Sequence, residues 1–289
     1  MRGWWQDLSD LVLPAECGGC GRPRTALCPE CRAALNGAVP SRVRPVPEPP
    51  GLPVVHAAAR YEDEVRAVLL AHKERGALAL AGPLGTALAG AVRAGLGRDL
   101  CGGTGVLLVP VPSARRAVRA RGHDPARRIA LAAAGALRGS GTPARVLAVL
   151  RQRRAVADQA GLDARQRLDN LAGALSVAGG GGRLLAGAGA VVLVDDLMTT
   201  GASLAEAARA VREAIGDGEA KEAGYVGDVR SLVYAEAAGE DTRKHSSRAP
   251  AAGVERRHGV PAKAAGGFRG MICAAVVAAT PDSFEINRN

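Results

Sequence analysis

The stretch that decides the fold is VVLVDDLMTTGAS, residues 191–203. Its first four residues are apolar and mostly β-branched, which is typical of a strand buried on both faces inside a parallel sheet. Ligands bind at the carboxyl ends of such strands. In this sequence that end carries two adjacent carboxylates, Asp195 and Asp196, which we call the acidic pair. The stretch therefore predicts an α/β domain with a ligand site directly after this strand.

The residues around the acidic pair suit a sugar phosphate. Two neighbouring carboxylates can accept hydrogen bonds from the vicinal hydroxyls of a ribose, or hold Mg²⁺. Gly201 permits a tight turn with positive φ, where backbone N–H groups can point at a phosphate. Thr199, Thr200 and Ser203 add hydroxyl donors. Ser203 through Glu206 has the form of a capping box, so we expect a helix to begin there.

A plain strand, turn and helix with acidic turn residues is the alternative interpretation. The full order of apolar run, Asp-Asp, Thr-Thr-Gly and Ser is more specific than a lone glycine-rich loop. It closely resembles the signature of the type I phosphoribosyltransferases, which bind phosphoribosyl pyrophosphate (PRPP). The resemblance implies that Asp195 and Asp196 are the catalytic residues and face the ribose hydroxyls. It also implies that the 5-phosphate is held by Thr199, Thr200, Gly201 and Ser203.

A second motif lies near the N-terminus, where Cys17 and Cys20 form one CxxC pair and Cys28 and Cys31 another, seven residues later. Four thiolates at these spacings suit tetrahedral Zn²⁺, and a closed set of four cysteines indicates a structural metal. The alternatives are two disulfides or four free thiols. The first residues contain no secretory signal, so we expect a reducing, cytoplasmic compartment in which disulfides are rare.

The two motifs in this order resemble the ComF family of competence-associated, phosphoribosyltransferase-like proteins. The resemblance covers most of residues 8–215 and again 271–289. It implies a parallel-sheet type I phosphoribosyltransferase fold with a small N-terminal zinc-ribbon-like module, and PRPP with Mg²⁺ as the ligand. Further matching stretches are residues 11–14, YEDEVRAVLLAHKERG at 61–76, the segment 109–112 with the arginines and glycine after it, Gln159, Leu162, Arg165 and Asn170, and residues 282–287.

The arginines after residue 112 have two interpretations. The resemblance implies that the loop beginning at Val111 lies on the pyrophosphate side, and guanidinium groups match phosphate oxygens. We assign Arg116, Arg119 and Arg121 to ligand contact, whereas the alternative is a solvated basic helix face. The chain departs from the family here, because HDP at 123–125 stands where Phe-Asn-Gln is usual.

Composition limits the classes of function. The chain has 289 residues, a formal net charge of +10 and 2% aromatic residues. A basic chain favours polyanionic partners such as pyrophosphate, nucleotides or nucleic acid. The few aromatic residues argue against stacking platforms for single-stranded nucleic acid and predict an aliphatic core. No run of about eighteen apolar residues occurs, so we predict no transmembrane helix.

The chain divides into three expected parts. Residues 1–35 hold the zinc module, residues 36–53 form a stiff proline-rich linker, and residues 54–289 form the phosphoribosyltransferase-like domain. The strands expected in this domain are 54–61 at a sheet edge, 106–109, 175–177 and 272–278, with 146–150 as a short strand or helix. The expected helices are 64–72, 78–93, 126–137 and 164–171, and a flexible turn is expected at 179–182.

Residues 216–268 differ from the rest of the chain. They mix glycine, alanine, serine and charged residues with few large apolar ones, which predicts a mostly disordered insertion. The sheet then resumes at 272–278, next to the strand at 191. We prefer this assignment to a competing strand at 229–235 because its apolar run is longer.

Two functions fit these observations. The first is an enzyme that transfers the phosphoribosyl group of PRPP to an acceptor that the sequence does not reveal. The second is a non-catalytic module for DNA uptake that binds PRPP or a related nucleotide, with the zinc module contacting single-stranded DNA or a competence protein. Redox chemistry at the CxxC pairs is a third, weaker interpretation.

Overall fold

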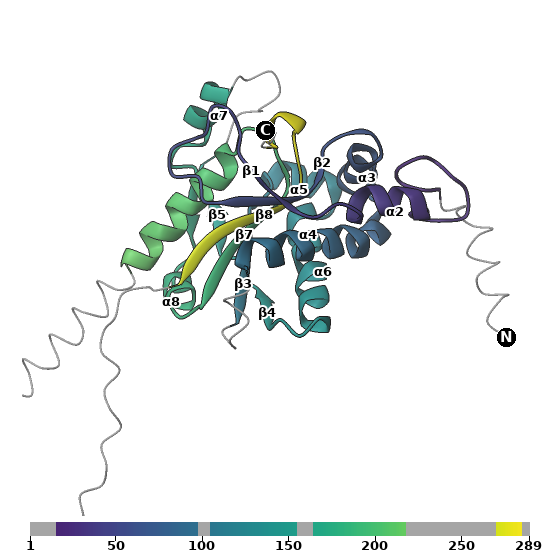
Figure 1. Ribbon diagram of the computed structural model, residues 1–289. Helices are drawn as coiled ribbons and strands as arrows, with labels where there is room; N and C mark the ends of the chain where they lie inside the picture. The colour runs from purple at the N-terminus through teal and green to yellow at the C-terminus, as the bar shows by residue number, and fades with distance from the viewer. Residues whose placement is uncertain (1–15, 98–104, 155–163, 218–269, 285–289) are drawn as a thin grey trace, which may run out of the picture.

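The computed structural model of the protein describes residues 16–97, 105–154, 164–217 and 270–284 (Figure 1). These residues form an α/β protein around a six-stranded sheet in which every pairing is parallel except the one at the β1 edge. The parallel α/β class predicted from the sequence is confirmed. In spatial order the strands are β1 (Ser41–Val43), β2 (Val55–Arg60), β8 (Met271–Ala279), β7 (Ala190–Met198), β3 (Val106–Pro110) and β4 (Ala144–Val146).

The central strand is β7, as the apolar run at 191–194 predicts. It pairs with β3 on one side and with β8 on the other, and it continues through the acidic pair to Met198. The predicted strand at 272–278 is confirmed, because Ile272 lies in register with Val191. The competing strand at 229–235 and nearly all of the predicted insertion fall on residues 218–269, outside the described residues.

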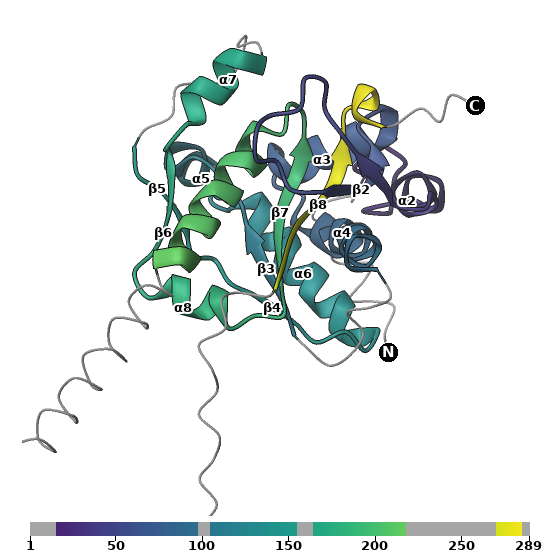
Figure 2. The ribbon, with the colours of Figure 1, turned by 60° about the vertical axis from the view of Figure 1, so that its left-hand side comes forward.

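Two helical layers cover the sheet, because alternate side chains of each strand point to opposite faces. Helices α3 (Asp63–Lys73), α4 (Ala81–Leu96) and α6 (Pro125–Gly139) cover one face, and the helix over residues 202–217 with the small sheet of β5 (Leu150–Gln152) and β6 (Leu175–Val177) covers the other (Figures 1 and 2). Val192 and Val194 lie in the apolar cluster of the first layer, whereas Val191 and Leu193 lie in that of the second. Within the first of these layers, α4 and α6 pack closely at small residues. A side chain at Gly85 of α4 would lie 2.5 Å from the Ala132 Cβ on α6.

Most of the remaining elements follow the predicted order, but the short strand or helix expected at 146–150 is wrong, because residues 147–149 form neither and connect β4 to β5. The helices are α2 (Pro29–Asn36), α3 (Asp63–Lys73), η1 (Leu78–Leu80), α4 (Ala81–Leu96), α5 (Arg115–Arg121), α6 (Pro125–Gly139), α7 (Ala164–Leu171), α8 (Gly181–Ala186), the helix over 202–217 and η3 (Pro281–Ser283). The second sheet consists of β5 (Leu150–Gln152) and β6 (Leu175–Val177). The helix expected at 78–93 opens as a 3₁₀ turn, and the turn expected at 179–182 leads directly into α8.

One strand prediction is wrong in its position. The strand at 54–61 was expected at a sheet edge, but β2 lies inside the sheet, between β1 and β8. The outer strand β1 comes from the proline-rich segment 36–53, where Arg42 pairs with His56. Residues 41–43 precede the prolines at 45 and 47, so their N–H groups are available to the ladder. Part of the expected linker therefore belongs to the sheet.

One stretch, Leu78–Leu96, is long and apolar enough to cross a membrane by length and composition alone. A core helix passes the same test, and α4 contacts β2, β8 and α6. Leu84, Leu88 and Val92 on this helix are fully buried against those elements. Its apolar composition is therefore explained by its place in the core.

Candidate functional site

The four N-terminal cysteines come together in space, and we call them the cysteine cluster. The sulfur atoms of Cys17, Cys20, Cys28 and Cys31 all lie within 4.8 Å of one another, and none of them forms a disulfide. The Cys20 and Cys28 sulfurs are 3.6 Å apart, close to the spacing of about 3.8 Å that follows from zinc–sulfur bonds of about 2.3 Å in a tetrahedron. The cluster can therefore hold a metal ion such as zinc.

Local sequence builds this cluster. Cys28 caps the N-terminus of α2, since its sulfur accepts from the Cys31 N–H, and Pro29 follows at the first helical position. The glycines between Cys17 and Cys20 have no room for a side chain. A Cβ at Gly18 would lie 2.6 Å from the Leu80 side chain, and one at Gly19 would lie 2.6 Å from the Cys31 sulfur.

The cluster is part of the main core. Cys17, Cys28 and Cys31 are buried in the same apolar cluster as α3 and α4, and Cys20 alone of the four is exposed. Burial raises the pKa of the Cys31 thiol. Burial also raises the pKa of Cys17, but the backbone N–H groups of Cys28, Cys20 and Gly19 outweigh it and lower this pKa to about 6. Zinc needs thiolates, so metal uptake would release protons.

The acidic pair lies at the carboxyl end of β7, where it meets a lysine that the sequence analysis did not select. The Nζ atom of Lys73 lies 2.9 Å from one carboxylate oxygen of Asp196 and 3.3 Å from the other. The Asp196 side chain is 6% exposed and that of Lys73 is 32% exposed. Alternation along β7 puts Asp196 on the face of Val192 and Val194, which is the face that α3 covers.

The pKa values of Asp195 and Lys73 are shifted by the charged groups around the acidic pair. Burial and the neighbouring Asp196 raise the pKa of Asp195, and Lys73 and the Asp196 N–H oppose that rise. The Asp196 N–H donates to an Asp195 carboxylate oxygen over 2.8 Å. Burial alone lowers the pKa of Lys73, but Asp196 and Asp195 outweigh it and raise this pKa. Lys73 is therefore the counter-charge of both carboxylates.

The turn after β7 has the geometry that its sequence predicts. Gly201 adopts φ +74°, and its carbonyl accepts from the Ala205 N–H in the first turn of the helix over 202–217. The N–H groups of a first helical turn have no partner within the helix. The Thr199 side chain is exposed and those of Thr200 and Ser203 are half-buried. The predicted phosphate ligands therefore gather at one helix N-terminus.

The predicted capping box is wrong. The helix begins at residue 202, one position before Ser203, so Ser203 cannot be its cap. Glu206 points elsewhere: its buried carboxylate accepts from the Leu175 N–H over 2.9 Å and pairs with Arg209. Arg209 in turn donates to the Leu175 carbonyl. The pair ties β6 to this helix, which a local sequence pattern does not reveal.

The arginine loop begins beside β7, because the Val111 N–H donates to the Val194 carbonyl. Of the three predicted ligand arginines, Arg121 lies beside the end of α3. It pairs with Glu74 over 2.8 Å and is close enough to Lys73 to act on the pKa of that lysine, which it lowers. Arg116 and Arg119 are exposed on α5. The structure therefore brings one of the three close to Lys73, the ion-pair partner of Asp196, and none of the three, all of which the structure describes, is paired with the acidic pair itself.

His123 joins the arginine loop to α3. Its Nδ1 lies 3.2 Å from the Arg121 carbonyl and its Nε2 lies 3.2 Å from the His72 carbonyl. The His123 ring also lies near the buried ring of His72, tilted by 60° from it with the ring centroids 5.5 Å apart. The ring thus connects the ends of the two helices that carry Lys73 and Arg121.

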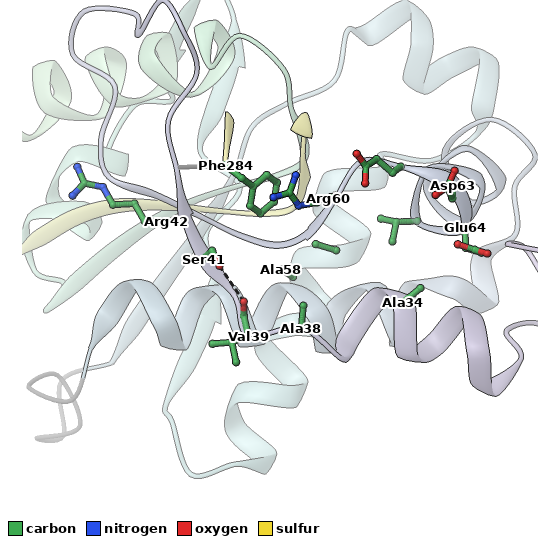
Figure 3. Close-up of a pocket in the computed structure, with 13 residues that line it drawn as sticks. Ala34, Ala38, Val39, Ser41, Arg42, Ala58, Arg60, Asp63, Glu64 and Phe284 are labelled. Carbon is green, nitrogen blue, oxygen red and sulfur yellow. Dashed lines mark hydrogen bonds between the residues drawn. The ribbon is translucent and has the colours of Figure 1, made fainter. Parts of the chain in front are cut away.

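Two clefts lie away from the acidic pair. One, of about 380 Å³, runs between α2, the β1–β2 edge and the start of α3, where the Arg60 guanidinium stacks 4.7 Å from the Phe284 ring (Figure 3). The other, of about 760 Å³, lies at the amino ends of β3 and β4. Neither is lined by Asp195 or Asp196. At the acidic pair itself, the Lys73 ammonium contacts both oxygens of the Asp196 carboxylate.

The described residues thus define an α/β protein with a mostly parallel sheet and a four-cysteine centre that can hold a metal. Comparison with known proteins adds no family to this description, because no family model and no curated protein matches the chain. Gln159 and Leu162, which belong to the stretches that resemble the family, lie outside the described residues.

Proposed function

We propose that this chain is a PRPP-binding protein with a type I phosphoribosyltransferase fold, related to the ComF family, and that it transfers the phosphoribosyl group to an acceptor. The observation that carries the proposal is the carboxyl end of β7. Two carboxylates there lead through a positive-φ glycine into a helix N-terminus, with Lys73 paired to Asp196 and Arg121 paired to the adjacent Glu74. Such an arrangement presents acceptors to sugar hydroxyls and donors to phosphates.

The proposed roles follow from the chemistry of each group. In the transfer, the C1–O bond to pyrophosphate breaks as the acceptor bonds to C1, and the sugar passes through an oxocarbenium-like state. Carboxylates at the ribose stabilise the developing positive charge, and cations stabilise the leaving pyrophosphate. The carboxylate oxygens of the acidic pair are suitable ligands for Mg²⁺, which would further neutralise the charge of the diphosphate. Asp196 becomes available to a ligand once Lys73 leaves it.

Calorimetric titration with PRPP and Mg²⁺ tests this proposal. The wild-type chain should bind PRPP, and the double variant Asp195→Asn, Asp196→Asn should lose that binding while its melting temperature shows that it is folded. A matched control is Asp169→Asn, which alters an acid on α7. Unchanged PRPP affinity in the double variant would contradict the proposal.

The exposed arginines of α5 favour a second candidate, a non-catalytic module that binds a nucleotide and nucleic acid. Arg115, Arg116 and Arg119 face solvent and are free to contact a phosphate backbone. Pyrophosphate release with a panel of acceptors separates the two candidates, since an enzyme turns PRPP over. Binding of PRPP without turnover, with single-stranded DNA affinity that falls steeply with salt, would favour the second candidate.

A further inference from the structure

We propose that Lys73 is a built-in counter-ion that closes the acidic pair in the free protein and changes partner, from Asp196 to the diphosphate, when the ligand binds. This inference rests on the proposed function, because it assumes a diphosphate ligand at the end of β7. It starts from one contact that the sequence pattern does not contain. The Lys73 ammonium meets both oxygens of Asp196, at 2.9 and 3.3 Å.

The contact occupies the carboxylate that a ligand would need. The Asp196 side chain is only 6% exposed, so a ribose hydroxyl or a hydrated cation cannot reach its oxygens while Lys73 remains there. The ammonium also balances Asp195, the second carboxylate of the pair. Without a ligand, Lys73 therefore supplies the positive charge that Mg²⁺ would otherwise bring, and divalent cations alone should bind weakly.

The same geometry allows the ammonium to leave. Lys73 is the last residue of α3, and its side chain keeps 32% of its surface exposed on a flexible four-carbon stem. The neighbouring acid Glu74 does not hold it, because that carboxylate is paired with Arg121 at 2.8 Å. The helix end itself is fixed, since the buried His72 carbonyl lies against His123. The backbone can therefore stay in place while the side chain turns.

A diphosphate would give the ammonium a new partner. The pyrophosphate-side loop begins at Val111, whose N–H is bonded to β7 one residue before the acidic pair. A diphosphate placed between this loop and the acidic pair carries several negative charges within reach of the lysine stem. Ligand binding then exchanges one ion pair for another, and it leaves Asp196 free for the ribose or its metal. This exchange would make metal binding at the acidic pair depend on the diphosphate.

The exchange is tested by measuring the affinity of the full, zinc-loaded chain for Mn²⁺ in the absence of any nucleotide. The concentration of free Mn²⁺ is measured by its electron paramagnetic resonance signal. Lys73→Met keeps the stem and removes the charge, so it should bind Mn²⁺ about tenfold more tightly than wild type. The same variant should bind PRPP with Mg²⁺ about tenfold more weakly, because the diphosphate loses a cation. Arg66→Met, which removes an exposed cation from the same helix, should change neither affinity.

A second variant keeps the test decisive if Lys73→Met does not fold. Lys73→Arg retains the charge and can donate two N–H groups to Asp196. The Mn²⁺ affinity of this variant should therefore be equal to or weaker than that of the wild type. Unchanged Mn²⁺ affinity in Lys73→Met, or unchanged PRPP affinity, would overturn the inference. The proposed function fails separately, if the double variant of the acidic pair still binds PRPP.

Discussion

The cysteine cluster, which can hold a metal ion, and the acidic pair, which we propose as a ligand site, are built in different ways. The four sulfurs lie within 4.8 Å of one another in a site formed by residues 17–31, and three of the four cysteines are buried. The two carboxylates lie at the end of a central strand, and their counter-charge comes from Lys73, more than a hundred residues earlier in the chain. The cysteine cluster is formed entirely by residues close together in the sequence. The acidic pair is covered by Lys73, a side chain from a distant segment that can move away.

The difference indicates two kinds of role. A closed set of four soft ligands inside the core suits a metal that holds the structure together. An ion pair at the edge of the sheet, with a partly exposed lysine, suits a site where a ligand replaces a contact that the free protein makes. Substitutions should therefore affect stability most at the cysteine cluster and affect binding most at the acidic pair.

The largest effect is expected from the cysteine cluster. Cys31→Ser removes a buried ligand, and because structural zinc contributes directly to folding, the free energy of unfolding should fall by at least about 3 kcal/mol. Metal analysis together with urea unfolding checks this. Cys273→Ser, in a buried cysteine of β8 outside the cluster, is the control for loss of a thiol. Equal zinc content in Cys31→Ser and wild type would contradict the structural role.

A smaller loss of stability is expected when the ion pair between Lys73 and Asp196 loses only its carboxylate. Asp196→Ala leaves the Lys73 ammonium without its partner in a partly buried position, which should cost about 1–3 kcal/mol after allowance for the lysine's exposure. Adding Lys73→Met should recover most of that loss, because a buried pair replaced on both sides is often neutral. A double-mutant cycle measured by urea unfolding checks this, and strictly additive losses would show that the two side chains do not interact.

The sequence predicts most of the fold and the cysteine cluster, because these depend on local patterns. The apolar run at 191–194 identifies the central strand, and the CxxC spacing identifies the cluster. The partner of Asp196 could not be predicted, since Lys73 reads locally as the end of an amphipathic helix. The true contacts of Glu206 were missed for the same reason, as its partner Leu175 lies in another element. Contacts between distant segments depend on how the helices are placed on the sheet.

A pH-dependent effect is expected at the Glu206 contact. Burial raises the pKa of Glu206, but Arg209 and the Leu175 N–H outweigh it and lower this pKa below its usual value. A lowered pKa stabilises the fold above the unfolded value of about 4.3 and loses that contribution as the pH falls through the folded value. Glu206→Gln should cost about 1–2 kcal/mol at pH 7 and progressively less below pH about 4.

Urea unfolding of wild type and Glu206→Gln across this pH range measures the difference. Glu213→Gln is the matched control, because Glu213 pairs with the same arginine from the exposed side. Its smaller effect should reflect a solvent-exposed ion pair. A difference for Glu206→Gln that stays constant from pH 7 to pH 3 would show that the carboxylate charge is not what ties β6 to the helix over 202–217.

The smallest effect on stability is expected for a substitution in the turn after β7. This substitution tests the ligand site next to the acidic pair without changing any charged residue. Gly201→Ala places a Cβ at φ +74°, which costs about 1 kcal/mol, and that Cβ would lie 3.2 Å from Leu52 and 3.3 Å from Pro45 of the proline-rich segment. Gly180→Ala is the matched control, because Gly180 is a left-handed glycine with φ +79° and no neighbour within 4 Å of its Cβ. Both variants should lose about the same backbone contribution to stability, but only Gly201→Ala should weaken PRPP binding, since it shifts the N–H groups of the 199–201 turn. Equal PRPP affinity in both variants would show that the 199–201 turn does not bind the ligand, which would contradict the proposed phosphate site next to the acidic pair.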